Sequence, residues 1–147
     1  MRKFLIAAAI LLTACAPAPP PQIRDITKEP WYGPTVDELA DMNREAAAAY
    51  AKGDADKASA LILKGQPLVA KILAAPHPPL EATVAASDLD TLYGRMLLAN
   101  KHYGWARMQF QKDYSRWKHW QPKTEDSERR LKLDGDAIDE CDKHLPE

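Results

Sequence analysis

Apolar residues recur at steps of three and four along the chain after residue 35, and this spacing constrains the fold more than any other feature of the sequence. The longest run of such positions is Leu89, Leu92, Met96, Ala99, Tyr103, Ala106, Phe110 and Trp117, which Asp113 interrupts. This spacing places side chains on one face of an α-helix, whereas a half-buried strand needs a step of two. It predicts a single helix over residues 88–118, about 46 Å long at 1.5 Å per residue, with Gly104 as the position of a bend.

Turn and capping residues divide the preceding apolar stretches into two further helices. Thr35 and Glu38 have the spacing of a capping box and predict that the first helix begins at Thr35. Gly53 suits the position that ends this helix, and Asp54 suits the N-cap of the next. Residues 65–67, Gly-Gln-Pro, interrupt the apolar stripe of the second helix, so a kink or a break is expected there.

A last helix is predicted close to the C-terminus. Pro122 ends the long helix, and Thr124 and Ser127 offer caps for the next one. The apolar face of this helix consists of Leu131, Ile138, Cys141 and Leu145. No stretch after the leader shows the alternating pattern of a strand. The predicted fold class is therefore all-α, a small bundle of about four helices joined as αα-hairpins.

The first fifteen residues have the composition of a secretory signal. Arg2 and Lys3 provide a positive start, and residues 4–12 form an uncharged apolar run. A helix that spans a bilayer needs about 20 apolar residues, so this run is too short for a permanent anchor. A positive start, a short apolar run and small residues after it are typical of a signal peptide.

Leu12, Thr13, Ala14 and Cys15 close this segment, and they resemble the lipobox of bacterial lipoproteins. The resemblance implies that a diacylglyceryl group is attached to the Cys15 thiol and that the signal is cut off before Cys15. The N-terminal lipid would then bind the chain to a membrane. The alternative is an ordinary signal peptide that contains a cysteine. In Gram-negative lipoproteins an aspartate after the cysteine favours the inner membrane, so Ala16 implies the outer membrane for a Gram-negative source.

Proline is concentrated directly after Cys15, because six of the twelve prolines lie in residues 16–34. Proline fixes φ and lacks a backbone donor, so this segment is predicted to be an extended tether. Trp31 and Tyr32 are expected to fold back onto the domain, with contact to a partner as the alternative. The predicted organisation is a signal peptide in residues 1–14, a lipidated cysteine and Pro-rich tether in 15–34, and a helical domain in 35–147.

No catalytic, cofactor or metal motif is recognisable in the sequence. The charge balance, 20 Lys+Arg against 21 Asp+Glu, gives no reason to expect a nucleic-acid partner. Cys141 and His144 lie three residues apart, which is half of a zinc site, but spacing indicates no further ligands. A packed thiol beside a surface histidine is the prediction, and with Cys15 lipidated this thiol has no disulfide partner. We therefore expect neither an enzyme nor a cofactor or metal site.

Charge is distributed unevenly over the last third of the chain. Residues 95–123 hold seven basic residues and a single acidic residue, Asp113. Residues 124–147 hold nine acidic and four basic residues. One hypothesis is that the basic helix and the acidic helix are antiparallel neighbours whose charges fix their register. The alternative is a binding surface for anionic lipid or a cell-wall glycan. This surface would consist of Trp105, Arg107, Lys112, Arg116 and Trp120.

These observations favour a non-catalytic, lipid-anchored helical protein of the cell envelope, with a structural or protein-interaction role. Its expected partners are a membrane, through the N-terminal lipid, and another envelope protein. The alternative is a binding module for anionic lipid or glycan, and an enzyme with an unrecognised site ranks last.

Overall fold

A computed structural model describes residues 24–146, so the predicted signal peptide, the lipobox with Cys15, and residues 16–23 of the tether lie outside the described residues. The elements are a short 3₁₀ turn η1 (Ile26–Lys28) and five helices, α1 (Tyr32–Ala51), α2 (Ala55–Ile72), α3 (Leu80–Ala99), α4 (Tyr103–His119) and α5 (Glu125–Asp142). No strand occurs among residues 24–146, which confirms the all-α prediction, with five helices where about four were expected. None of the described helices is both long and apolar enough to cross a bilayer.

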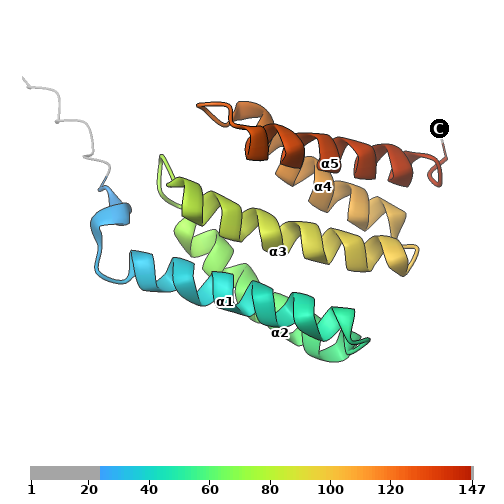
Figure 1. The fold of residues 1–147 in the computed structure, drawn as a ribbon, viewed down its shortest axis with the longest axis horizontal. Coiled ribbons are helices and arrows are strands. Elements are labelled where there is room, and N and C mark those ends of the chain that lie inside the picture. Colours follow the sequence, from blue (N-terminus) through green and yellow to red (C-terminus); the bar gives the residue numbers. More distant parts are fainter. Residues whose placement is uncertain (1–23, 147) are drawn as a thin grey trace, which may run out of the picture.

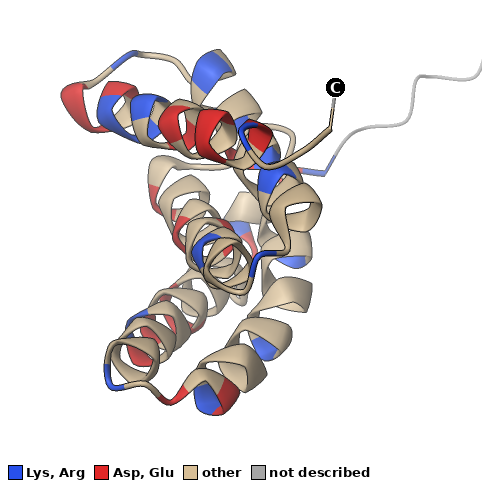
Figure 2. Ribbon diagram, turned by 90° about the vertical axis from the view of Figure 1, so that its right-hand side faces the viewer, with Lys and Arg blue, Asp and Glu red and all other residues tan. Residues whose placement is uncertain are grey.

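The helices form two successive antiparallel hairpins around α3. Helix α3 contacts α1, α2 and α4, while α5 contacts chiefly α4. Figure 1 shows α1, α3 and α5 nearer the viewer and α2 and α4 behind them. Turning the molecule by 90° shows that both acidic and basic residues occur along α5, the uppermost helix (Figure 2). Helices α1 and α5 lie on opposite sides of α3, and residues of all three helices line an open groove on one face.

The larger hydrophobic core joins α1, α2 and α3. Leu39, Ile62, Ile72 and Leu89 are fully buried in it. Gly65 allows α2 to lie close to Leu89, since a Cβ atom at this glycine would overlap the leucine side chain. Helix α2 is continuous through Pro67, so the break that was considered there is absent.

A second, smaller core holds α4 and α5 against the C-terminal half of α3. Ala106, Phe110 and Cys141 are its buried members, with half-buried hydrophobic residues packed around them. Gly94 lets the Phe110 ring approach α3, because a Cβ atom there would lie 2.8 Å from the ring. With so few apolar side chains, polar contacts must supply much of the remaining attachment.

The prediction of one helix over residues 88–118 is wrong. Helix α3 ends at Ala99, Lys101 adopts a φ of 62°, and α4 begins at Tyr103. Gly104 therefore lies in the first turn of α4, not at a bend within a longer helix. The reversal lets Phe110 and Trp117 pack against α3 and become buried, whereas a straight helix would carry them away from the domain.

The predicted turn at Gly53 and Asp54 and the predicted start of the last helix are confirmed, whereas the third helix begins at Leu80 and not at residue 88. Gly53 has a φ of 82° after α1, and the Asp54 side chain accepts a hydrogen bond from the Lys57 backbone N–H at 3.0 Å. Thr124 and Ser127 cap each other's backbone N–H at the start of α5, as their positions predicted.

The predicted capping box at Thr35 is wrong, because α1 begins at Tyr32. The Thr35 hydroxyl instead donates to the backbone carbonyl of Trp31 at 2.7 Å. The prediction that Trp31 and Tyr32 fold back is confirmed: the Tyr32 hydroxyl donates to the Ile72 carbonyl at 2.8 Å, and Trp31 packs against the core.

Candidate functional site

The three cations of the predicted surface on α4 are bound to acidic residues of the domain itself. Arg107 forms an ion pair with Asp142 of α5, as the register hypothesis expects. Lys112 and Arg116 instead bind Asp90 of α3, with N–O distances of 2.7 and 3.0 Å. The acidic partners are thus divided between α5 and α3, and the charges fix α4 against both helices.

The two tryptophans of that surface lie in different surroundings. Trp105 is 63% exposed near the start of α4. Trp120 follows the end of α4, is half-buried and packs edge-on against Trp117, with ring centroids 6.0 Å apart. The described structure therefore does not bring the five predicted residues together as one exposed surface.

Asp113 is the centre of a buried polar network between α3 and α4. Its carboxylate accepts hydrogen bonds from the hydroxyls of Ser87 at 2.5 Å and Thr91 at 3.0 Å, and it forms an ion pair with Arg116. The Trp117 indole N–H donates to the Ser87 hydroxyl at 2.8 Å. Buried polar groups need such partners, because an unpaired one costs about 1–3 kcal/mol. The network therefore specifies how α4 lies on α3.

Asp134 brings a third buried carboxyl group to this network from α5. It is only 3% exposed, and its Oδ2 has no hydrogen-bond partner among the hydrogen bonds of residues 24–146. Burial, which has the larger effect, and the negative charge of Asp113 raise the pKa of Asp134 to about 8. Burial also raises the pKa of Asp113, against the opposing effect of Arg116. At neutral pH Asp134 is therefore protonated, and its O–H can donate to the Asp113 carboxylate.

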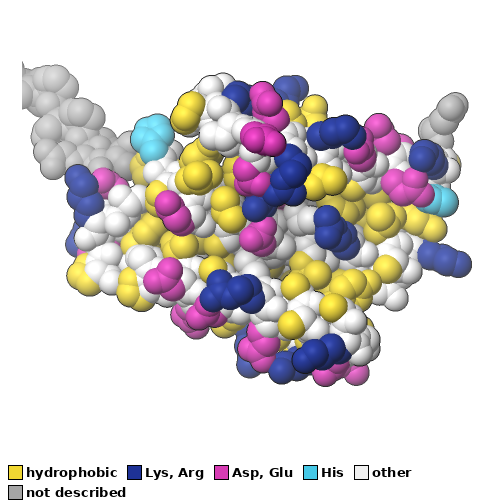
Figure 3. Space-filling view, viewed as in Figure 1, with side chains coloured by type: hydrophobic (Ala, Val, Ile, Leu, Met, Phe, Trp, Pro, Cys, Tyr) yellow, Lys and Arg dark blue, Asp and Glu magenta, His cyan; other side chains and the backbone are white. Residues whose placement is uncertain are grey.

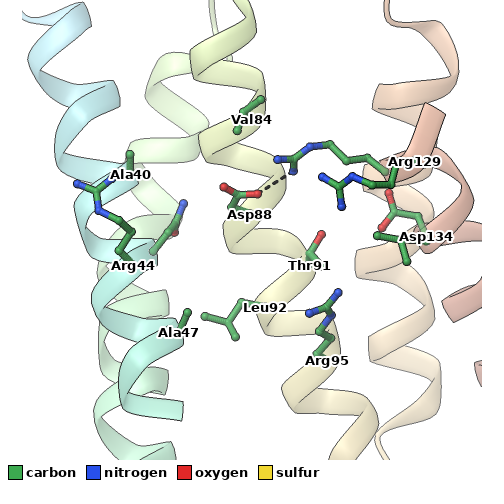
Figure 4. Close-up of a pocket in the computed structure, with 13 residues that line it drawn as sticks. Ala40, Arg44, Ala47, Val84, Asp88, Thr91, Leu92, Arg95, Arg129 and Asp134 are labelled. Carbon is green, nitrogen blue, oxygen red and sulfur yellow. Dashed lines mark hydrogen bonds and ion pairs between the residues drawn. The ribbon is translucent and has the colours of Figure 1, made fainter. Parts of the chain in front are cut away.

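Next to this network lies an open groove of about 570 Å³ between α1, α3 and α5. Its lining residues are Ala40, Asn43, Arg44, Ala47, Val84, Asp88, Thr91, Leu92, Arg95, Arg129, Arg130, Leu133 and Asp134. Alanine, valine and leucine side chains form an apolar strip, and four arginines stand around it (Figure 4). On the surface, basic, acidic and hydrophobic side chains are intermixed across the middle of this face (Figure 3).

The arginines of the groove differ in how far they are neutralised. Arg130 binds Asp88 at 2.7 Å, and it also binds Asp126 outside the groove. Arg129 shares Asp126, but its side chain is 57% exposed. Arg95 forms no ion pair within the described part of the chain, and Figure 4 shows it on α3, with Thr91 between it and Arg129 in this view. Because Arg44 also pairs with Asp41, Arg95 is the groove arginine that has no ion pair among residues 24–146.

The groove adjoins the buried carboxyl groups of Asp113 and Asp134. Asp113 is fully buried, whereas Asp134 is 3% exposed and is itself one of the residues that line the groove. In residues 24–146 no three side chains of the metal-ligating kinds are grouped as a metal site. Cys141 is buried, and the His144 ring stacks on Tyr103 with centroids 4.2 Å apart, which confirms the prediction of a packed thiol.

Sequence reasoning missed the groove, although part of its signal was visible. Asp113 interrupts the apolar run of α4, and Asp134 lies at helical spacing from Ile138 and Cys141 on the apolar face of α5. An acidic residue on an apolar face is the mark of a buried polar network. Comparison of the chain with models of protein families, with curated proteins and with solved structures finds no match. The groove must therefore be interpreted from its own residues.

Proposed function

We propose that this protein is a lipid-anchored, non-catalytic interaction protein of the cell envelope, and that a partner protein binds in the groove between α1, α3 and α5. The resemblance of residues 12–15 to a lipobox supports the anchor, with the lipid on Cys15. The observation that supports the binding role is the groove itself. It is open, has a volume of about 570 Å³, and is lined by apolar side chains and four arginines. Exposed apolar surface rimmed by polar groups is typical of protein interaction sites, and arginine is enriched there.

A second candidate function is binding of anionic lipid or glycan through α4. One observation favours it: Trp105 and Met108 lie one turn apart and are both more than half exposed. Against it, Arg107 and Arg116 are already bound to acids of the domain, so the positive field that would attract an anionic surface is weakened. The groove on the other side of α3 combines apolar surface with Arg95, which has no ion pair within residues 24–146.

Two exposed leucines allow a matched test of the groove. Leu133 lines the groove and is 42% exposed, whereas Leu63 of α2 is 64% exposed and lies outside it. A photo-crosslinking amino acid is placed at either position in the full-length protein, which is then irradiated in its native envelope. We expect a discrete protein adduct from position 133 and not from position 63, detected by immunoblotting and identified by mass spectrometry. Adducts that form equally at both positions would contradict the proposal.

A further inference from the structure

The three walls of the groove carry residues at helical spacing. On α1 they are Ala40, Asn43, Arg44 and Ala47, and on α3 they are Val84, Asp88, Thr91, Leu92 and Arg95. The stripe on α3 covers about 16 Å at 1.5 Å per residue, close to three helical turns. Ala40 and Ala47 are small, so a helix can approach α1 closely, because the side chains at a contact set the distance between two helix axes. The groove is therefore suited to bind one more helix, which would lie between α1 and α5.

The charges that line the groove indicate which charge the bound helix should carry. Arg95 lacks an ion pair within residues 24–146, and Arg129, on the opposite wall (Figure 4), pairs with Asp126 but remains 57% exposed. Asp88, one of the two acidic residues that line the groove, is already bound to Arg130 at 2.7 Å. The protonated state of Asp134 adds no negative charge to the wall. A carboxylate placed between Arg95 and Arg129 would accept charge-assisted hydrogen bonds from both.

We propose that the groove binds an acidic amphipathic helix of the partner protein, whose apolar face lies on Leu92 and Leu133 and whose carboxylates pair with Arg95 and Arg129. Helix-in-groove binding uses anchors at steps of three and four, which match the stripes on the walls. This inference rests on the proposed function, because it names the class of segment that the partner presents to the groove.

The test uses the full-length lipidated protein in nanodiscs of zwitterionic lipid, with empty nanodiscs as the blank. The probe is a fluorescent peptide of about four helical turns with leucine and alanine on one face and glutamate on the other. A second peptide has lysine in place of every glutamate. Fluorescence anisotropy should show saturable binding of the glutamate peptide alone, weakened when salt rises from about 0.03 to about 0.3 M. Equal binding of the lysine peptide would overturn the inference.

Two substitutions and a matched control locate the peptide. Arg95→Gln should weaken binding about tenfold, the effect of losing one hydrogen bond to a charged group. Leu133→Glu should abolish it, because it places a like charge on the apolar strip. Lys118→Gln removes an exposed lysine of α4, outside the groove, and should leave binding unchanged. Circular dichroism of each variant verifies the fold. If Arg95→Gln and Lys118→Gln have the same effect, the groove is not the site.

The outcomes also separate this inference from the proposed function. If the glutamate peptide does not bind while position 133 still forms protein adducts, the acidic-helix inference fails and the proposed function stands. If neither occurs, both fail. An adduct from position 133 with twice the mass of the protein would show that a second copy of this chain occupies the groove, and that result would overturn the inference.

Discussion

At the scale of single residues, Asp134 makes the stability of the fold depend on pH. Its pKa of about 8 in the folded protein exceeds the ordinary value of 3.8, because the side chain is buried beside Asp113. Between these two pH values the folded state holds a proton that the unfolded state has lost. The contribution of Asp134 to stability is therefore complete below about pH 4 and is lost as pH rises towards about 8.

The variant Asp134→Asn tests whether the stability of the fold decreases as pH rises because of Asp134. The asparagine amide keeps a donor for the Asp113 carboxylate but does not ionise. For the wild type we expect the free energy of unfolding to decrease by up to about 1.4 kcal/mol per pH unit between pH 5 and 8. The variant should show a much flatter profile and exceed the wild type by about 1–3 kcal/mol at pH 8. Urea denaturation at a series of pH values measures both. Identical slopes for the two proteins would show that Asp134 does not hold this proton.

At the scale of helices, the attachment of α4 to α3 depends on one buried cation. Arg116 contacts both Asp90 and Asp113, and its side chain is 14% exposed. Arg116→Gln would leave two buried carboxylates short of a partner, which costs about 3–5 kcal/mol. Arg107→Gln breaks a more exposed pair with Asp142 and should cost no more than about 1 kcal/mol.

Hydrogen exchange can locate the effect of Arg116→Gln within the fold. Amides of α4 and α5 should exchange faster than in the wild type, while those of α1 and α2 keep their protection, because the large core lies on their side of α3. Loss of protection in all five helices alike would show that the domain unfolds as one unit instead. Arg107→Gln serves as the control for removal of a cation from α4.

The sequence predicts the helices better than it predicts their ends and contacts. Apolar spacing identified the helical class, and Gly53 with Asp54 marked a turn because their local chemistry needs no distant partner. The reversal near Lys101 was missed because the spacing of three and four continues across it. The meeting of Asp113 with Asp134, and the groove, depend on how separate helices pack, and no local pattern records that.

At the scale of the whole molecule, the proposed lipid anchor on Cys15 is the feature that would determine where the domain works. Cys15→Ser removes the thiol that would carry lipid, so the protein should lose its labelling by radioactive palmitate and remain unprocessed or soluble. The structure of residues 24–146 should be unaffected, because Cys15 lies outside them. Membrane fractionation and mass measurement of the mature protein provide the check. A Cys15→Ser protein that partitions with membranes as the wild type does would contradict the anchor.

The contacts of Trp31 and Tyr32 have a mechanical consequence for an anchored protein. Any tension between membrane and partner enters the domain at the N-terminus of α1. The Tyr32 hydroxyl is bound to the Ile72 carbonyl and Lys71 lies 4.2 Å above the Trp31 ring, so the load is divided there between α1 and the end of α2. If the proposed anchor and partner pull on the chain, the wall of the groove that α1 provides would thereby share the load with α2.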